Sequence, residues 1–283
     1  MLDAISAEAI KFTRHRATWG LVWIWPIGLA AIGLVAIAVG LLNPAVADSG
    51  QANAAGWIAD AVAFWRVPGQ GLGRCVIGAF VAMVFAGEYG WNTWKLIVPH
   101  RARSTLIAAK YVVALALLGC GFVLGAMVFN LAGWAEDVLT GDPIPPGIEL
   151  GALAAAHGRG ALAAIAPLLL TTAYVSFAAI LTRSTVAALM IGFFVTTGEQ
   201  LFRLFAPLFE PYAPALIRAL YQALPGYHVV NIGGWITTGE LLQAPFASGV
   251  YSAPFAVSLA IVAFWVVLLV GLTFWRFRRQ DIN

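Results

Sequence analysis

The sequence has little charge. Asp, Glu, Lys and Arg make up 10% of its 283 residues, whereas 61% of the residues are hydrophobic. Soluble domains contain roughly 25% charged residues, so this composition excludes an ordinary soluble protein. Several apolar runs approach the roughly 20 residues that a helix needs to cross a bilayer. We therefore expect an all-α integral membrane protein, with residues 1–283 forming a single transmembrane domain.

The sequence also lacks the motifs of most enzymes and metalloproteins. Its two cysteines, Cys75 and Cys120, lie in or beside apolar runs, without the spacing of a disulfide framework or a zinc site. None of the three lysines belongs to a Gly-x-x-x-x-Gly-Lys-Ser/Thr loop, so the chain has no P-loop for ATP. The four histidines are far apart, with no acidic residue at metal-ligand spacing. We expect no cofactor and no metal in this chain, and an intramembrane enzyme stays an alternative for which no catalytic cluster is found.

Hydropathy predicts six transmembrane helices with shorter segments between them. Residues 2–17 place apolar side chains on one helical stripe, which predicts an N-terminal in-plane helix at the membrane surface. Residues 206–253 contain five prolines and apolar runs too short to span a bilayer, which indicates short surface or re-entrant helices. The turn between them is expected near Leu224, Pro225, Gly226 and Asn231. The predicted spans are residues 19–42, 71–86, 111–133, 160–181, 186–205 and 255–275.

Single residues add detail to these spans. Pro26 is expected to kink the first span, and Arg74 is expected to extend from the second span to the membrane interface. Gly121 and Gly125 form a GxxxG pair in the third span, which permits close approach of another helix. The loop after this span is rich in proline and acidic residues, so regular structure is not expected there. Its carboxylates are Glu136, Asp137, Asp142 and Glu149.

The charges are distributed unevenly between the two predicted sides of the membrane. With six spans both termini lie on one side, together with eleven of the sixteen Lys and Arg residues. By the positive-inside rule that side is cytoplasmic. We expect a multi-pass protein of a bacterial-type cytoplasmic (inner) membrane, and the small net charge of +3 does not favour a nucleic acid as partner. The eleven residues are Lys11, Arg14, Arg16, Lys95, Arg101, Arg103, Lys110, Arg183, Arg276, Arg278 and Arg279.

A basic stretch with two tryptophans, residues 87–110, separates the second and third predicted spans. Read as a short amphipathic helix, it places Trp91 and Trp94 on one side. Glu88 falls in the first turn, where a carboxylate is favoured, and Pro99 lies beyond the end. The residues alone are equally compatible with an interfacial helix whose tryptophans lie among lipid headgroups.

The order of residues in this stretch resembles a segment of the ABC-2 type transporter permeases. An acidic residue is followed by Thr93, Lys95 and Pro99, then by an arginine and by Lys110 at the start of the next span, although the Gly-Thr pair usual in that family is Asn92-Thr93 here. The resemblance implies a cytoplasmic coupling helix that docks on a separate ABC ATPase subunit, which would bind ATP and Mg²⁺. The residues assigned to ATPase coupling are Glu88, Trp91, Thr93, Trp94, Lys95, Arg101 and Arg103.

The same resemblance implies the permease subunit of an ATP-driven exporter, paired with a second copy of itself or with a homologous permease. It also implies that residues 206–253 form short extracytoplasmic helices that close the outer end of the pathway. A non-transporting assembly or sensory subunit would use the same docking surface and remains an alternative. The scarcity of charge and the many aromatic and small residues mildly favour an amphipathic or lipid-like substrate, a peptide or a drug over a small ion.

One pair of ionisable residues lies within a predicted span. Glu199 and Arg203 are four residues apart in the fifth span and therefore share a helix face, and Gln200 extends this polar patch. Charges inside a membrane usually face protein or water, so the functional interpretation is a translocation path or gate. The alternative is an ion pair whose members satisfy only each other near the outer end of the helix.

Overall fold

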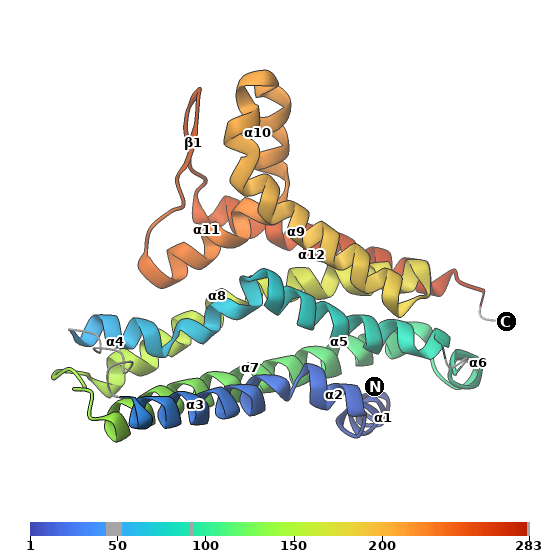
Figure 1. The fold of residues 1–283 in the computed structure, drawn as a ribbon. Helices are drawn as coiled ribbons and strands as arrows, with labels where there is room; N and C mark the ends of the chain where they lie inside the picture. The colour runs from blue at the N-terminus through green and yellow to red at the C-terminus, as the bar shows by residue number, and fades with distance from the viewer. Residues whose placement is uncertain (44–52, 91–92, 282–283) are drawn as a thin grey trace.

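The computed structural model describes residues 1–43, 53–90 and 93–281, and they form long helices that lie side by side (Figure 1). Six helices in this part of the chain are long and apolar enough to cross a membrane, in agreement with the predicted number. They are α3 (Ile24–Leu42), α5 (Gly71–Gly90), α7 (Arg103–Thr140), α8 (Leu150–Thr182), α9 (Thr185–Phe209) and α12 (Phe255–Arg278).

The first predicted span is interrupted earlier than expected. The N-terminal helix α1 (Leu2–Thr13) is followed by a short helix α2 (Arg16–Leu21), and the chain turns at Val22 and Trp23 before α3 begins. Pro26 does not kink the span, because it is the third residue of α3, where a backbone N–H has no carbonyl partner within the helix.

The third and fourth spans are longer than their apolar runs. Helix α7 continues to Thr140 and ends at Gly141, whose φ of 82° is the left-handed conformation that glycine adopts readily. The prediction of an irregular acidic loop was therefore wrong for Glu136 and Asp137, which lie in the last turns of α7. The Asp137 carboxylate accepts a hydrogen bond of 2.8 Å from the Trp57 indole, a long-range contact that no local sequence pattern reveals.

Small residues allow α3 and α7 to approach closely. A Cβ at Gly33 would lie 2.6 Å from the Cβ of Ala132, and a Cβ at Gly40 would lie 2.6 Å from Cγ2 of Thr140. Gly121, from the predicted GxxxG pair, packs in the same way against Val22. These contacts hold the N-terminal span against α7 over most of its length.

Short elements precede α5 and connect α9 to α12. Two short helices were predicted in the second of these connections, and Leu224 lies between them as expected. The other residues of the predicted turn belong to the second helix: Pro225 and Gly226 begin it, and Asn231 lies inside it. The β-hairpin that follows was not predicted, since its strands have three residues each. The elements are α4 (Ala54–Ala61), the 3-10 helix η1 (Ala63–Gly69), η3 (Glu210–Tyr212), α10 (Pro214–Ala223), α11 (Pro225–Thr238), β1 (Ala244–Phe246) and β2 (Gly249–Tyr251).

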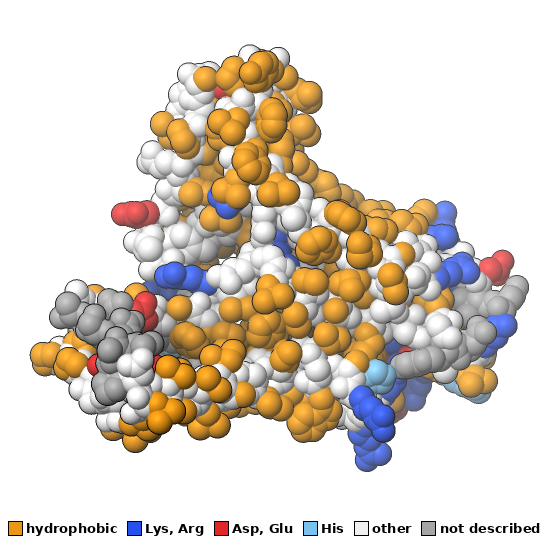
Figure 2. Space-filling model, viewed as in Figure 1, with side chains coloured by type: hydrophobic (Ala, Val, Ile, Leu, Met, Phe, Trp, Pro, Cys, Tyr) orange, Lys and Arg blue, Asp and Glu red, His pale blue; other side chains and the backbone are white. Residues whose placement is uncertain are grey.

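The two ends of the bundle differ in their elements and in their charge. Helix α1, the short helix α6 (Trp94–Ile97) and both chain termini lie at one end, whereas α4 and the α7–α8 connection lie at the other (Figure 1). Most of the Lys and Arg side chains visible in Figure 2 gather at the end that carries α6 and the termini. We call this end the basic end.

Candidate functional site

The segment between α5 and α7 lies at the basic end. It consists of one α-helical turn, α6, followed by the 3-10 turn η2 (Val98–His100), and Trp91 lies outside the described residues. The prediction of one amphipathic helix starting at Glu88 was wrong, because Glu88 lies in the last turn of α5. The backbone N–H of Thr93 donates to the Glu88 carbonyl, and the Thr93 hydroxyl donates to the Glu88 carboxylate. Glu88 therefore ends the second span instead of starting the next helix.

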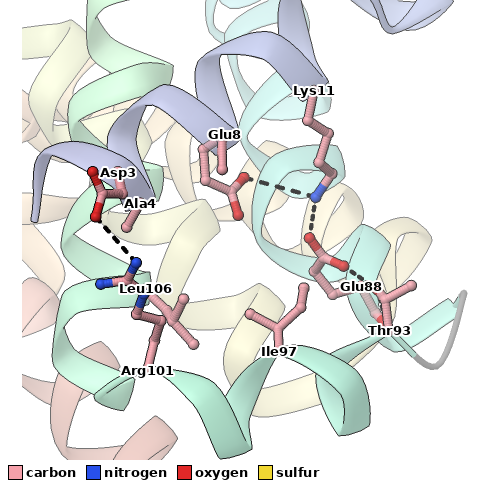
Figure 3. A pocket seen from close by; sticks show the side chains of 10 residues that line it. Asp3, Ala4, Glu8, Lys11, Glu88, Thr93, Ile97, Arg101 and Leu106 are labelled. Carbon is pink, nitrogen blue, oxygen red and sulfur yellow. Dashed lines mark hydrogen bonds and ion pairs between the residues drawn. The ribbon is translucent and has the colours of Figure 1, made fainter.

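Four charged side chains meet where α1, α5 and α7 pack together, and Figure 3 shows three of them, Glu8, Lys11 and Glu88. The Lys110 ammonium lies 3.2 Å from a Glu88 carboxylate oxygen and 3.3 Å from a Glu8 carboxylate oxygen, and it also donates to the carbonyl of Val84 at 3.0 Å. The Lys11 ammonium forms an ion pair with the Glu88 carboxylate and lies 3.7 Å from a carboxylate oxygen of Glu8. We call Glu8, Lys11, Glu88 and Lys110 the acid–base cluster.

Three members of the acid–base cluster are buried, Lys11 is half-buried, and the cluster carries no net formal charge. Lys110 is 0% exposed, Glu88 1% and Glu8 7%. Charged groups withdrawn from water are tolerated when they are paired and hydrogen-bonded, and removal of one partner leaves an uncompensated charge. The cluster therefore fixes α1, α5 and α7 to one another at the base of the segment.

Trp94 faces the protein and not the lipid headgroups. Its ring is 2% exposed and packs on Phe277 of α12 at 4.6 Å and on Tyr89 of α5 at 5.8 Å between ring centroids. The Lys110 ammonium lies 5.2 Å from the Trp94 ring, within the range of a cation–π contact. The interfacial interpretation therefore fails for Trp94, whose apolar side is covered by the end of α12.

Other predicted coupling residues lie on the surface of the segment. Lys95 and Arg101 are exposed, as are two neighbours outside the predicted set, His100 and Leu96, the latter at 71%. Arg101 forms an ion pair of 3.1 Å with Asp3 of α1. A cavity of about 350 Å³ opens between α1 and the segment, and Figure 3 shows Glu8, Lys11, Glu88 and Arg101 among the side chains that line it. The segment thus has a basic and partly apolar outer face, and the acid–base cluster lies on its inner side.

Arg103 points away from this outer face. It is the first residue of α7, and its guanidinium donates hydrogen bonds to three backbone carbonyls at the end of α12. The structure thus separates Arg103 from the exposed coupling residues.

The predicted pair Glu199–Arg203 is not formed. Glu199 instead lies 3.9 Å from the Arg74 guanidinium and accepts a hydrogen bond from the Tyr174 hydroxyl. Arg74 is 4% exposed and donates to the Thr171 hydroxyl at 3.0 Å, so the expectation that it reaches the membrane interface was also wrong. The i,i+4 rule considers only neighbours on one helix, whereas Arg74 of α5 and Glu199 of α9 lie on different helices, and both contact α8.

The other two residues of the predicted pathway patch make separate contacts. The Gln200 amide donates to the carbonyl of Gly69 at 2.8 Å, and this bond joins α9 to η1. The Nε of Arg203 is buried and has no hydrogen-bond partner among the described residues.

Sequence reasoning missed Glu8, Lys11 and Tyr174 as members of these sites. The available signal was the spacing of three between Glu8 and Lys11 on an amphipathic helix, together with Lys110 at the start of an apolar run. Their meeting across about a hundred residues depends on how α1 folds back onto α7, which no local pattern contains.

The profile of a family described as ABC-2 family transporter protein matches residues 4–199, from α1 to most of α9. The matched region contains the acid–base cluster, the segment between α5 and α7, and Glu199 with its partners. No curated protein matches the sequence.

Proposed function

Because the chain belongs to the ABC-2 family of transporter proteins, we propose that it is the permease subunit of an ATP-driven exporter and that a separate ABC ATPase subunit docks on residues 93–101. The ATPase would bind ATP and Mg²⁺, and this chain would need no cofactor of its own. The transport path would cross a cytoplasmic membrane of the bacterial type, with both termini on the cytoplasmic side.

The observation that carries this proposal is the acid–base cluster beneath the segment. A partner that pushes or pulls on residues 93–101 would move Thr93, which is bonded to Glu88, and Glu88 is in turn bonded to Lys110 and Lys11. Movement of the segment would therefore reach α1, α5 and α7 together. Two conformations of these helices, biased by the nucleotide state of the partner, are sufficient for alternating access.

The predicted coupling residues take two different roles in this proposal. Lys95 and Arg101 are exposed and would contact the ATPase, and Trp91 is assigned to the same surface. Glu88, Thr93 and Trp94 would transmit its movement from inside the protein. Glu199 with Gln200, and separately Arg203, are candidates for the pathway or its gate. A second copy of the chain or a homologous permease would complete the pathway within the lipid bilayer.

Two variants test whether the segment couples ATP hydrolysis to transport. Glu88→Ala leaves Lys110 with one carboxylate partner fewer, and Trp94→Ala removes the contact with Phe277. Loss of one member of a buried ion pair costs about 3–5 kcal/mol. A loss of this size is enough to separate movement of the segment from movement of the long helices. We expect the copurified complex to keep hydrolysing ATP while ATP-dependent flux in vesicles falls at least about tenfold, the equivalent of about 1.4 kcal/mol.

A matched surface variant separates docking from transmission. Lys95→Ala should weaken copurification with the ATPase and leave the thermal stability of the isolated chain unchanged, because Lys95 is exposed. Unaltered flux and coupling in both Glu88→Ala and Trp94→Ala would overturn the proposed role of the segment. A copurifying ATPase without ATP-dependent flux or stimulation for any member of a substrate panel would instead indicate a non-transporting assembly or sensory subunit.

A further inference from the structure

The end of α12 is held by a residue that belongs to another helix. The Nη1 atom of Arg103 donates to the carbonyls of Phe277 at 3.2 Å, Arg278 at 3.0 Å and Gln280 at 2.6 Å. An arginine in the first turn of α7 is electrostatically disfavoured there by the free N–H groups of that turn. At the end of α12 the same cation lies at the negative pole of the helix, close to its last carbonyls. The position of Arg103 is therefore favourable for the end of α12 and not for the start of α7.

Gln280 lies just after α12 and binds the end of this helix to two other helices. It is 2% exposed; its amide nitrogen donates to the carbonyl of Ile180 in the last turn of α8, and its amide oxygen accepts from the hydroxyl of Tyr89 in α5. Phe277, one turn earlier, is covered by Trp94. We call Arg103, Gln280 and the Trp94–Phe277 contact the α12 clasp, and it joins α12 directly to both ends of the segment between α5 and α7.

The first turn of α12 is also fixed by polar contacts, to α11. The Ser258 hydroxyl lies 2.9 Å from Nδ1 of His228 and accepts a hydrogen bond of 2.8 Å from the Asn231 amide. Asn231 also donates to the carbonyl of Ala253, immediately before α12, and accepts from the N–H of Leu242, before the hairpin. His228, Asn231 and Ser258 are all 0% exposed, so these bonds are shielded from water.

Between these two ends α12 is one uninterrupted helix. Its 24 residues contain no proline and span about 36 Å at 1.5 Å per residue. Apolar side chains that pack along the middle allow sliding more readily than directional hydrogen bonds do. The directional contacts between α12 and other elements are thus concentrated at the clasp and at Ser258, with further hydrogen bonds from Trp265 to the carbonyl of Ala223 and between Thr273 and Tyr111 of α7.

We propose that α12 transmits movement of the segment at the basic end to α11 and the β1–β2 hairpin, which lie at the N-terminal end of α12. Arg103 and Gln280 are positioning residues in this mechanism, because they fix α12 to the segment without contacting a transported molecule. The inference rests on the proposed function, since it requires that an ATPase moves residues 93–101. It adds the route by which that movement reaches the far end of the chain.

Two distance measurements on the copurified complex in nanodiscs test this route. The native cysteines are first replaced by Cys75→Ala and Cys120→Ala. Spin labels at the exposed residues Ala102 and Val186 then report movement at the basic end, and labels at the exposed residues Glu149 and Val250 report movement of the hairpin relative to α8. Each label is attached to a cysteine substitution, and the distances are measured by electron–electron double resonance without nucleotide and with ATP and vanadate.

The proposal predicts that the two label pairs respond differently when the contacts at either end of α12 are removed. In Arg103→Ala and in Gln280→Ala, the ATP-induced shift at the basic end should persist while the shift at the hairpin falls to less than half. Ser258→Ala, which releases the other end of α12, should produce the same pattern. Arg279→Ala is the matched control, because Arg279 is exposed, has the same charge, and contacts the Trp275 ring outside the clasp. It should leave both shifts unchanged.

The outcomes distinguish failure of the proposed role of α12 from failure of the proposed function. A full hairpin shift in both Gln280→Ala and Ser258→Ala would overturn the proposal, and these two variants suffice if Arg103→Ala does not fold. Equal loss of both shifts in the clasp variants would show a general structural defect and would also overturn it. Absence of any nucleotide-dependent shift at the basic end of the unmodified complex would instead contradict the proposed function.

Discussion

At the scale of single residues, the position of Arg74 changes the interpretation of the fifth long helix. Its guanidinium lies between the Thr171 hydroxyl, the Thr196 carbonyl and the Glu199 carboxylate, within an otherwise apolar bundle. A lone charge at the centre of a membrane costs roughly 2.5–3.5 kcal/mol on insertion scales. Arg74 and Glu199 therefore limit each other's cost across two helices, whereas Arg203 takes no part in the pair.

A double-mutant cycle measures this pairing. Arg74→Met leaves Glu199 without its cation, and Glu199→Gln leaves Arg74 without its anion, so each single change should destabilise the purified protein by about 2–4 kcal/mol. The double variant should be more stable than the sum of the single effects predicts, by about 1–3 kcal/mol. Unfolding of the protein in detergent by added denaturant gives these free energies.

The same cycle with Arg203 is the control. Glu199→Gln and Arg203→Ala should be additive, because the structure contains no ion pair between these two residues. Coupling between Glu199 and Arg203, together with additivity between Glu199 and Arg74, would restore the pairing expected from the helix spacing alone and contradict the structure.

At the scale of elements, the contacts that were foreseen are local and those that were not are long-range. The number and order of the long helices follow from apolar runs, because each helix satisfies its own backbone hydrogen bonds inside a membrane. The Trp94 side of the segment was correctly recognised as apolar, but its partner was expected to be an ATPase or lipid headgroups and is Phe277, almost two hundred residues away. The hairpin was missed because three-residue strands leave no recognisable alternation.

The junction of α11 with α12 should be sensitive to pH. Nε2 of His228 lies 2.9 Å from the Gln222 carbonyl and therefore carries the proton, which leaves Nδ1 to accept from Ser258. Burial lowers the pKa of His228 below its usual value. As the pH falls below about 6.5, the unfolded chain takes up a proton that the folded chain resists. The free energy of unfolding should therefore fall by up to about 1.4 kcal/mol per pH unit.

A pH series of thermal unfolding in nanodiscs checks this expectation. The unfolding temperature should be nearly constant above pH 7 and decrease below it, whereas His228→Gln should be less stable at neutral pH with a flatter profile at acidic pH. Identical slopes in the two proteins would assign the acid sensitivity to other groups.

At the scale of the whole molecule, the elements that were expected on the cytoplasmic side lie at one end of the bundle, which is also the basic end. The segment between α5 and α7, α1 and both termini share the basic end, as an even number of spans requires (Figure 1). The sequence predicted this parity from the number of spans. The distribution of Lys and Arg then predicted which side is cytoplasmic, because the positive-inside rule depends on loop composition and not on packing. The shape of α10 and the hairpin, which rise from one side of the bundle, depends on packing and was not predictable.

Cysteine accessibility tests the orientation that follows from this parity. In a chain with Cys75→Ala and Cys120→Ala, the substitution Arg183→Cys should react with membrane-impermeant thiol reagents only from the cytoplasmic side, because Arg183 lies in the α8–α9 turn at the basic end. Asp142→Cys, in the α7–α8 connection, should react only from outside. Reversed accessibility would mean that the orientation or the span count is wrong.

The neutrality of the buried charges has an electrical consequence. Moving one elementary charge through the membrane field changes the free energy by about 2.3 kcal/mol per 100 mV. The acid–base cluster contains two carboxylates and two ammonium groups, and Arg74 is matched by Glu199. Helices that carry these groups can therefore shift along the membrane normal with little net gating charge. We expect the labelled distances, measured on the complex reconstituted in sealed vesicles, to be the same with and without a potential imposed by a potassium gradient and valinomycin, so that ATP and not voltage sets the conformation.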